Sequence, residues 1–139
     1  MTSDAPILTY ADACLLFLGF RDKGIRGQKA AEILDDKRRV FVVSDALWLE
    51  VMPSPLRNKQ HDEVAFYERF FARARHIPMS DAIMRRARDL AGRYYLDAMD
   101  AIHIAYALHA GADQFISAEN STKRMFLVQE MPVLTIALK

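Results

Sequence analysis

The sequence predicts an α/β fold, a three-layer α/β/α sandwich around a mainly parallel sheet of four to five strands. Two observations lead to this class. Short runs of apolar and β-branched residues alternate with longer amphipathic segments, and this alternation requires crossover connections between parallel strands. The clearest run, VFVV at residues 40–43, is apolar at every position, which is typical of a strand covered by helices on both faces.

The strands are predicted from runs of this kind. Each run is short, contains β-formers and is bounded by polar or turn-forming residues. Ile77, which precedes Pro78, adds a candidate for a short edge strand, the place in a sheet where proline is tolerated. The four main strands are expected at residues 7–10, 40–43, 115–117 and 133–136.

The helices are predicted from apolar spacing and from the residues that begin and end them. Ser44, Ser80 and Asp97 are suited to cap helix N-termini, and Gly111 is suited to end a helix. The proline-rich stretch at residues 53–60 is predicted to be a loop. The expected helices are residues 13–20, 25–37, 46–52, 64–74, 82–94, 98–110 and about 122–128.

Composition excludes several classes of protein. The 139 residues fit a single domain, 1–139, with 52% apolar and 27% charged residues. The net charge of +1 argues against a strongly basic nucleic-acid coat or a polybasic membrane binder, although a local basic patch remains compatible with it. Cys14 is the single cysteine, so no intrachain disulfide or cysteine-based zinc site is expected, and a reducing cytoplasm suits the chain.

The beginning of the chain predicts no targeting segment. Its first twenty residues contain no basic region ahead of the apolar stretch, and Asp12 interrupts that stretch. We therefore expect neither a signal peptide nor a membrane span.

Four acidic residues stand out by position, whereas most others, Glu63 included, lie among basic residues and are expected on solvated helix faces. Asp12 and Glu119 each follow a predicted strand, Glu50 lies in the apolar helix after another, and Asp100 lies near the start of a helix. Each has a structural alternative. Asp12 suits a helix cap, Glu50 could face solvent, Asp100 could form a capping pair with Asp97, and Glu119 could be a first-turn acid.

Taken together, the four positions favour a shared site. In a parallel sheet the carboxyl ends of the strands lie at one edge, where ligands bind. Carboxylates that converge there repel one another unless a cation lies between them. A hard divalent ion such as Mg²⁺ is the natural partner of such oxygens, and phosphodiester hydrolysis is the chemistry that uses it.

Several segments resemble PIN-domain nucleases, in particular the VapC-type toxins of toxin–antitoxin pairs. They are ILTYADACLLF, SDALWLEVM, LDAMDAIHIAYALHAGADQFIS and the AEN that follows. The resemblance extends from about Ile7 to Ile136. It implies a site that binds Mg²⁺ or Mn²⁺ and hydrolyses RNA, with the four acids falling on Asp12, Glu50, Asp100 and Glu119 as catalytic residues and metal ligands.

The resemblance also suggests supporting residues and partners. Asp97, Ser117 and His103 are candidates to support the acids by hydrogen bonds, and Lys123 and Arg124 follow Glu119 closely enough to contact RNA. The expected partners are an RNA substrate and a small antitoxin protein, with no membrane and with a homodimer as an option.

Two departures from the family pattern keep an alternative open. Glu119 stands where the family usually has Asp, and Ala13 and Cys14 stand where it often has a small polar residue. These departures favour a catalytically weak or inactive PIN-like module for binding or assembly. A receiver-like phosphoacceptor also has acids at strand ends, but no counterpart of its late lysine is evident.

Overall fold

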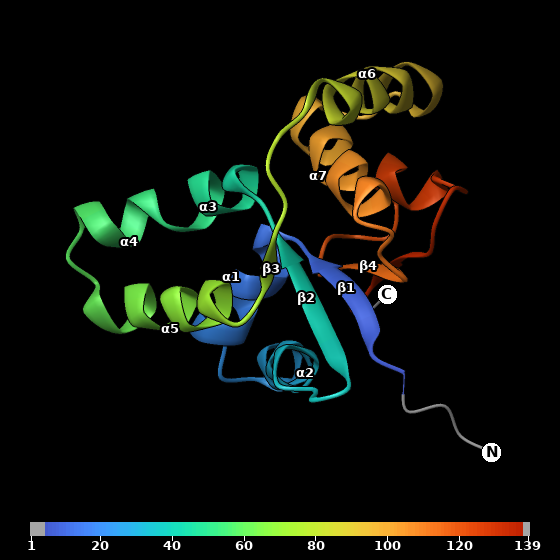
Figure 1. The fold of residues 1–139 in the computed structure, drawn as a ribbon. Helices are drawn as coiled ribbons and strands as arrows, with labels where there is room; N and C mark the ends of the chain where they lie inside the picture. Colours follow the sequence, from blue (N-terminus) through green and yellow to red (C-terminus); the bar gives the residue numbers. More distant parts are fainter. Residues whose placement is uncertain (1–4, 138–139) are drawn as a thin grey trace.

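The computed structural model describes residues 5–137 and contains one parallel sheet of five strands. The order across the sheet is β3-β2-β1-β4-β5, and every neighbouring pair is parallel. The three-layer α/β fold expected from the sequence is confirmed (Figure 1). The strands are β1 Ile7–Ala11, β2 Arg39–Val43, β3 Arg75–His76, β4 Gln114–Ser117 and β5 Val133–Thr135.

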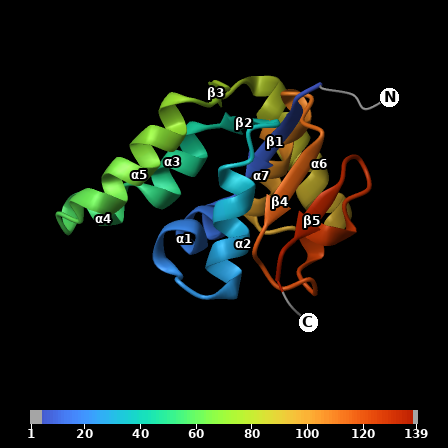
Figure 2. The same ribbon diagram turned by 90° about the horizontal axis from the view of Figure 1, so that it is seen from below.

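Helices connect the strands and cover both faces of the sheet. Figure 2 shows α1 and α2 on one side of the strands and α6 and α7 on the other. The helices are α1 Ala13–Arg21, α2 Ile25–Leu34, α3 Asp45–Val51, α4 Pro53–Arg57, α5 His61–Ala72, α6 Asp81–Tyr94 and α7 Ala98–His109, with the 3₁₀ helix η1 Arg124–Leu127 before the last strand.

Two separate hydrophobic cores result from the alternation of side chains along the strands. Tyr10, Val42 and Phe115 point to the face covered by α6 and α7, while Ala11 and Ile116 point to the opposite face, covered by α1, α3 and α5. Because both faces are buried, the central strands are apolar at successive positions, as the sequence indicated.

The helix caps form as predicted and fix where the helices begin. The Ser44 hydroxyl accepts the backbone N–H of Leu47 at 3.1 Å, and the Ser80 hydroxyl accepts that of Ile83 at 3.2 Å. Each bond satisfies one of the free N–H groups at a helix N-terminus. Since β2 ends at Val43, the Ser44 cap starts α3 directly at the carboxyl end of the sheet.

Three local predictions differ from the structure. Residues 53–60 are not simply a loop: Pro53 begins the short helix α4, because proline fits the first turn of a helix, where its missing N–H costs nothing. The edge strand lies at Arg75–His76 rather than at Ile77. The helix expected near residues 122–128 is the single 3₁₀ turn η1.

Glu63 is the clearest error among the acids expected on solvated faces. It is only 4% exposed. Its carboxylate accepts hydrogen bonds from the Tyr67 hydroxyl at 2.5 Å and from Arg21 Nε at 2.8 Å. These two donors compensate the loss of solvent around the charge.

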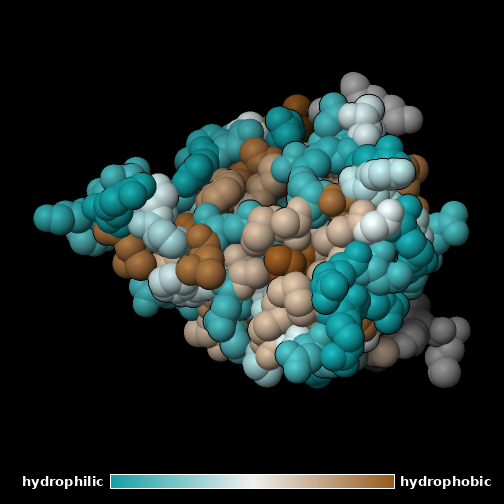
Figure 3. Space-filling view, turned by 90° about the horizontal axis from the view of Figure 1, so that it is seen from above, coloured by the Kyte–Doolittle hydropathy of each residue, from teal (hydrophilic) through white to brown (hydrophobic). Residues whose placement is uncertain are grey.

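Helices α3, α4 and α5 extend away from the sheet as an arm (Figure 2). Its surface carries exposed apolar side chains, among them Trp48, Leu49 and Leu56, and brown patches lie over this part of the molecule in Figure 3. No helix within residues 5–137 is long and apolar enough to cross a bilayer. The prediction that the chain starts without a targeting segment also covers residues 1–4, which lie outside the described residues.

Candidate metal and active site

Asp12 lies at the carboxyl end of β1 and caps α1. Its Oδ1 accepts the backbone N–H of Leu15 at 3.1 Å, and the carboxylate also forms a hydrogen bond with Ser117. The residue is 7% exposed. Burial raises the pKa of Asp12 to about 6, although the two hydrogen bonds lower it in part. The negative charge of Glu119 adds to the rise. Asp12 is therefore both a cap and a buried acid with an unusually high proton affinity.

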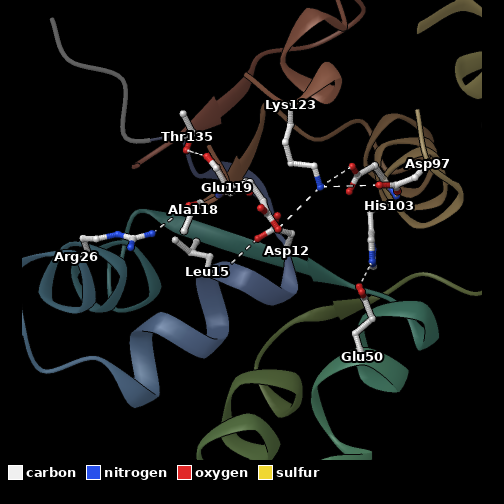
Figure 4. A network of polar contacts seen from close by, with 12 residues as sticks. Asp12, Leu15, Arg26, Glu50, Asp97, His103, Ala118, Glu119, Lys123 and Thr135 are labelled. Carbon is white, nitrogen blue, oxygen red and sulfur yellow. Dashed lines mark hydrogen bonds and ion pairs between the residues drawn. The ribbon is translucent and has the colours of Figure 1, made fainter. Parts of the chain in front are cut away.

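Lys123 places its ammonium group among three carboxylates. Its Nζ lies 3.2 Å from Asp100 Oδ2, 3.9 Å from Asp97 Oδ2 and 4.0 Å from Glu119 Oε1 (Figure 4). Asp97 also caps α7 by accepting the backbone N–H of Asp100 at 3.0 Å. Of the four acids expected to converge, Asp100 and Glu119 therefore meet around a cation that the chain itself supplies, with Asp97 as the third carboxylate.

The charges of this cluster shift each other's proton affinities. Burial raises the pKa of the Asp100 carboxyl, and its hydrogen bond with Lys123 opposes the rise without cancelling it. Burial by itself would lower the pKa of Lys123, but Asp100 and the neighbouring charges of Glu119 and Asp97 raise it overall. The ammonium is therefore held in its charged form, as a cation between carboxylates requires.

Glu119 is positioned by the end of β4 and by its neighbour β5. Its backbone N–H donates to the Ser117 hydroxyl at 2.9 Å, and its carbonyl accepts the Thr135 hydroxyl at 2.5 Å. Ser117 therefore bonds both to the backbone of Glu119 and to the side chain of Asp12. This shared hydroxyl links the ends of β1 and β4 at the site.

Glu50 is held by a separate hydrogen-bonded chain that crosses from α3 to α7. Its carboxylate contacts Nε2 of His103, which is 3% exposed. The other ring nitrogen lies 2.6 Å from the Tyr10 hydroxyl, which lies 2.8 Å from the Ser44 hydroxyl. Burial raises the pKa of Tyr10 far above its ordinary value, so the hydroxyl keeps its proton.

One assignment of the protons satisfies every group in this chain. Ser44 Oγ already accepts the N–H of Leu47, so its own proton is available to Tyr10. If Tyr10 then donates to Nδ1, the remaining ring proton lies on Nε2 and points to the Glu50 carboxylate. Every donor in the series Ser44, Tyr10, His103 and Glu50 then has an acceptor.

The fit of a divalent ion can be judged from the donor atoms present. Carboxylate oxygens are the ligands that Mg²⁺ and Mn²⁺ prefer, and the ammonium of Lys123 shows that a cation is stable between Asp100, Asp97 and Glu119. Within residues 5–137, however, no three His, Cys, Asp or Glu side chains stand in an arrangement that could hold a metal as they are. A metal would have to displace Lys123 and draw the carboxylates inward.

The sequence predicts that the four acids share a site, but it gives no sign of the groups that neutralise them. The sequence suggests Lys123 as an RNA contact, and the structure adds that its ammonium lies among the carboxylates of Asp97, Asp100 and Glu119. The partner of Glu50 is His103, which comes from another helix, α7. Burial raises the pKa of Cys14 to about 11, so this thiol is unsuited to act as a nucleophile.

Comparison with known families and structures gives consistent results. The family model described as PIN domain matches residues 9–125. No curated protein matches the sequence. Among solved structures, VapBC2 from Rickettsia felis bound to a DNA fragment from the promoter superposes with a TM-score of 0.71 at 10% identity, covering 93% of this chain and 98% of that one.

Two further structures share the fold. A toxin–antitoxin complex from Klebsiella pneumoniae has a TM-score of 0.68 at 21% identity, covering 89% of this chain and 98% of that chain. The toxin VapC20 from Mycobacterium tuberculosis, described as cleaving the sarcin–ricin loop, has a TM-score of 0.62 at 17% identity and covers 77% and 86% of the two chains. At these identities the likeness concerns the fold.

Proposed function

The chain belongs to the PIN domain family, a family of nucleases, and from this premise we propose that it is a metal-dependent endoribonuclease that acts as the toxin of a toxin–antitoxin pair. The observation that carries the proposal is the meeting of acids from separate segments at the carboxyl end of the sheet. Asp100 and Glu119 both form ion pairs with the ammonium of Lys123. Asp12 forms a hydrogen bond with Ser117 and is close enough to Glu119 for the two charges to interact.

The four acids share one role in the proposed reaction, and neighbouring residues support them. Asp12, Asp100 and Glu119, together with Glu50, would hold Mg²⁺ or Mn²⁺. When bound, such an ion stabilises negative charge on the phosphate and makes water more acidic. Ser117 orients the Asp12 carboxylate, and His103 orients that of Glu50. Lys123, once displaced from the acids, remains close enough to bind a phosphate oxygen of the substrate.

The toxin role is supported by the structural neighbours, which include toxin–antitoxin complexes. We propose a small antitoxin protein as the partner and RNA as the substrate, with a homodimer as a further prediction. The exposed apolar side chains of the arm formed by α3, α4 and α5 give such a partner a surface to cover.

The position of Lys123 favours a second candidate function. Its ammonium already neutralises the acids, and residues 5–137 contain no ready arrangement of metal ligands. Both features would suit a catalytically weak or inactive PIN-like module for binding or assembly. The two candidates differ in one property. A nuclease must bind the divalent ion at these acids, whereas a binding module need not.

Cleavage of an RNA panel in Mg²⁺, Mn²⁺ or EDTA tests the proposal. We expect cleavage that requires the metal and is abolished in Asp12→Asn and Asp100→Asn. Asp113→Asn, an exposed aspartate whose carboxylate accepts the backbone N–H of Leu8, is the matched control and should keep full activity. Full activity of the Asp12 or Asp100 variant would refute the assignment. Co-purification with a small protein tests the toxin role separately.

A further inference from the structure

Tyr95 has a backbone and an environment that the fold does not explain. It ends α6 with φ 56° and ψ 43°, in the left-handed region. Glycine or asparagine usually occupies this position, because a side chain there is sterically disfavoured. The ring is also 77% exposed, so it contributes little to the hydrophobic core. Both the local conformation and the exposure disfavour a large aromatic residue here. Residues that a protein keeps in a disfavoured conformation are often at functional positions.

Arg124 fixes a cation beside this ring. Its guanidinium carbon lies 5.2 Å from the centroid of the Tyr95 ring, within the range of a cation–π contact. Its Nε donates to the backbone carbonyl of Tyr94 at 2.7 Å. The arginine is thus anchored to the end of α6, and it presents a planar charged group next to an exposed aromatic surface.

A surface hollow of about 280 Å³ joins the ring to the acid cluster. Its lining includes Tyr95, Arg124, Lys123, Asp97 and Asp100. Lys123 is the same residue whose ammonium lies 3.2 Å from Asp100. One continuous depression therefore contains a stacking surface, two cationic side chains and two of the acids.

We propose that Tyr95 is a stacking platform for an unpaired base of single-stranded RNA, with Arg124 beside it as the cationic partner. An aromatic face combined with basic residues along a groove is the general means of binding a single strand. A base in a duplex is stacked between its neighbours and does not offer its face to the ring. The inference rests on the proposed nuclease function and adds to it a subsite next to the acids and a preference for unpaired RNA.

Binding can be measured without cleavage. A short, unstructured, fluorescently labelled oligoribonucleotide is titrated with the whole protein in EDTA, and its anisotropy gives the dissociation constant. Tyr95→Gly should weaken binding about 5- to 150-fold, the range found when a stacking aromatic is lost. Tyr95→Phe keeps the ring and should bind as the wild type does. Leu127→Ala removes another exposed apolar side chain and should leave the affinity unchanged.

The stability of the glycine variant separates a binding role from a structural one. Glycine adopts a positive φ without strain, so Tyr95→Gly should unfold at the wild-type temperature or above it while RNA binding weakens. Equal affinity of Tyr95→Gly and the wild type would overturn the inference, as would equal binding of the same sequence as a duplex. Tyr95-dependent binding without metal-dependent cleavage would leave the subsite intact and count against the nuclease.

Discussion

Asp12→Asn tests the electrostatics of the site without changing its shape. The asparagine side chain keeps an oxygen that can accept the Leu15 N–H, but it carries no charge. In the wild type, burial raises the pKa of Asp12 from an ordinary 3.8 to about 6. The variant therefore removes a buried charge and retains the helix cap.

The sign of the effect follows from proton linkage. A raised pKa means that the folded protein binds the Asp12 proton more tightly than the unfolded chain does. The free energy of unfolding is then unaffected by this group below about pH 4, falls as pH rises to about 6, and is level above that. A shift of about two units corresponds to about 3 kcal/mol. We expect Asp12→Asn to be more stable than the wild type by up to about 3 kcal/mol at neutral pH and equal to it in acid.

Urea unfolding in EDTA at low and neutral pH measures this difference. EDTA is required because a divalent ion would stabilise the charged form of the wild type. Asp113→Asn, at the opposite end of β4, is the control substitution, because Asp113 accepts a backbone N–H in the same way but is exposed. A stability difference for Asp12→Asn that is the same at both pH values, or a less stable variant at neutral pH, would refute the reasoning.

Three other substitutions test the charge balance elsewhere. Lys123→Met should lower the stability of the metal-free protein, which loses the cation shared by three carboxylates. It should also tighten Mn²⁺ binding about tenfold by calorimetry, since the ion no longer competes with the ammonium; an unchanged affinity would contradict this. His103→Gln interrupts the chain that holds Glu50 and should cost about 1–3 kcal/mol in urea unfolding, whereas wild-type stability would argue against the chain. Arg21→Met leaves the buried Glu63 carboxylate without its cation and should lower the free energy of unfolding by about 1–3 kcal/mol. The loss should be smaller than for a fully buried pair because Arg21 is half exposed. A stability that is unchanged and insensitive to salt would contradict this prediction.

The fold could be predicted from the sequence because its signals are local. Apolar strands such as residues 40–43 and the capping residues Ser44 and Ser80 determine their elements through neighbours along the chain. Pro53 was ambiguous, since a proline both ends one helix and begins the next. The edge strand Arg75–His76 has no apolar signal of its own, because it forms by pairing with β2.

The site could be predicted only in part, because its contacts are not local. The positions of Asp12, Glu50 and Glu119 after strands, and of Asp100 at the start of a helix, predict that the four acids meet, but they do not identify the partner of each. The partner of Glu50 is 53 residues away in the chain, and periodicity within α3 carries no information about it. Glu63 was misassigned in part for the same reason, since one of its two partners, Arg21, belongs to α1.

Lys123 affects how the proposed function depends on metal binding, because it already neutralises the acids of the site. Carboxylates that converge at the end of a sheet need a cation for the fold to be stable, and Lys123 supplies it without any metal. The metal-free protein can therefore fold with its site closed by an internal ion pair. In the proposed nuclease, a divalent ion would have to bind these acids more favourably than the ammonium of Lys123 does. Whether a divalent ion can displace Lys123 from these acids would therefore distinguish the proposed nuclease from a binding module, because both share the fold.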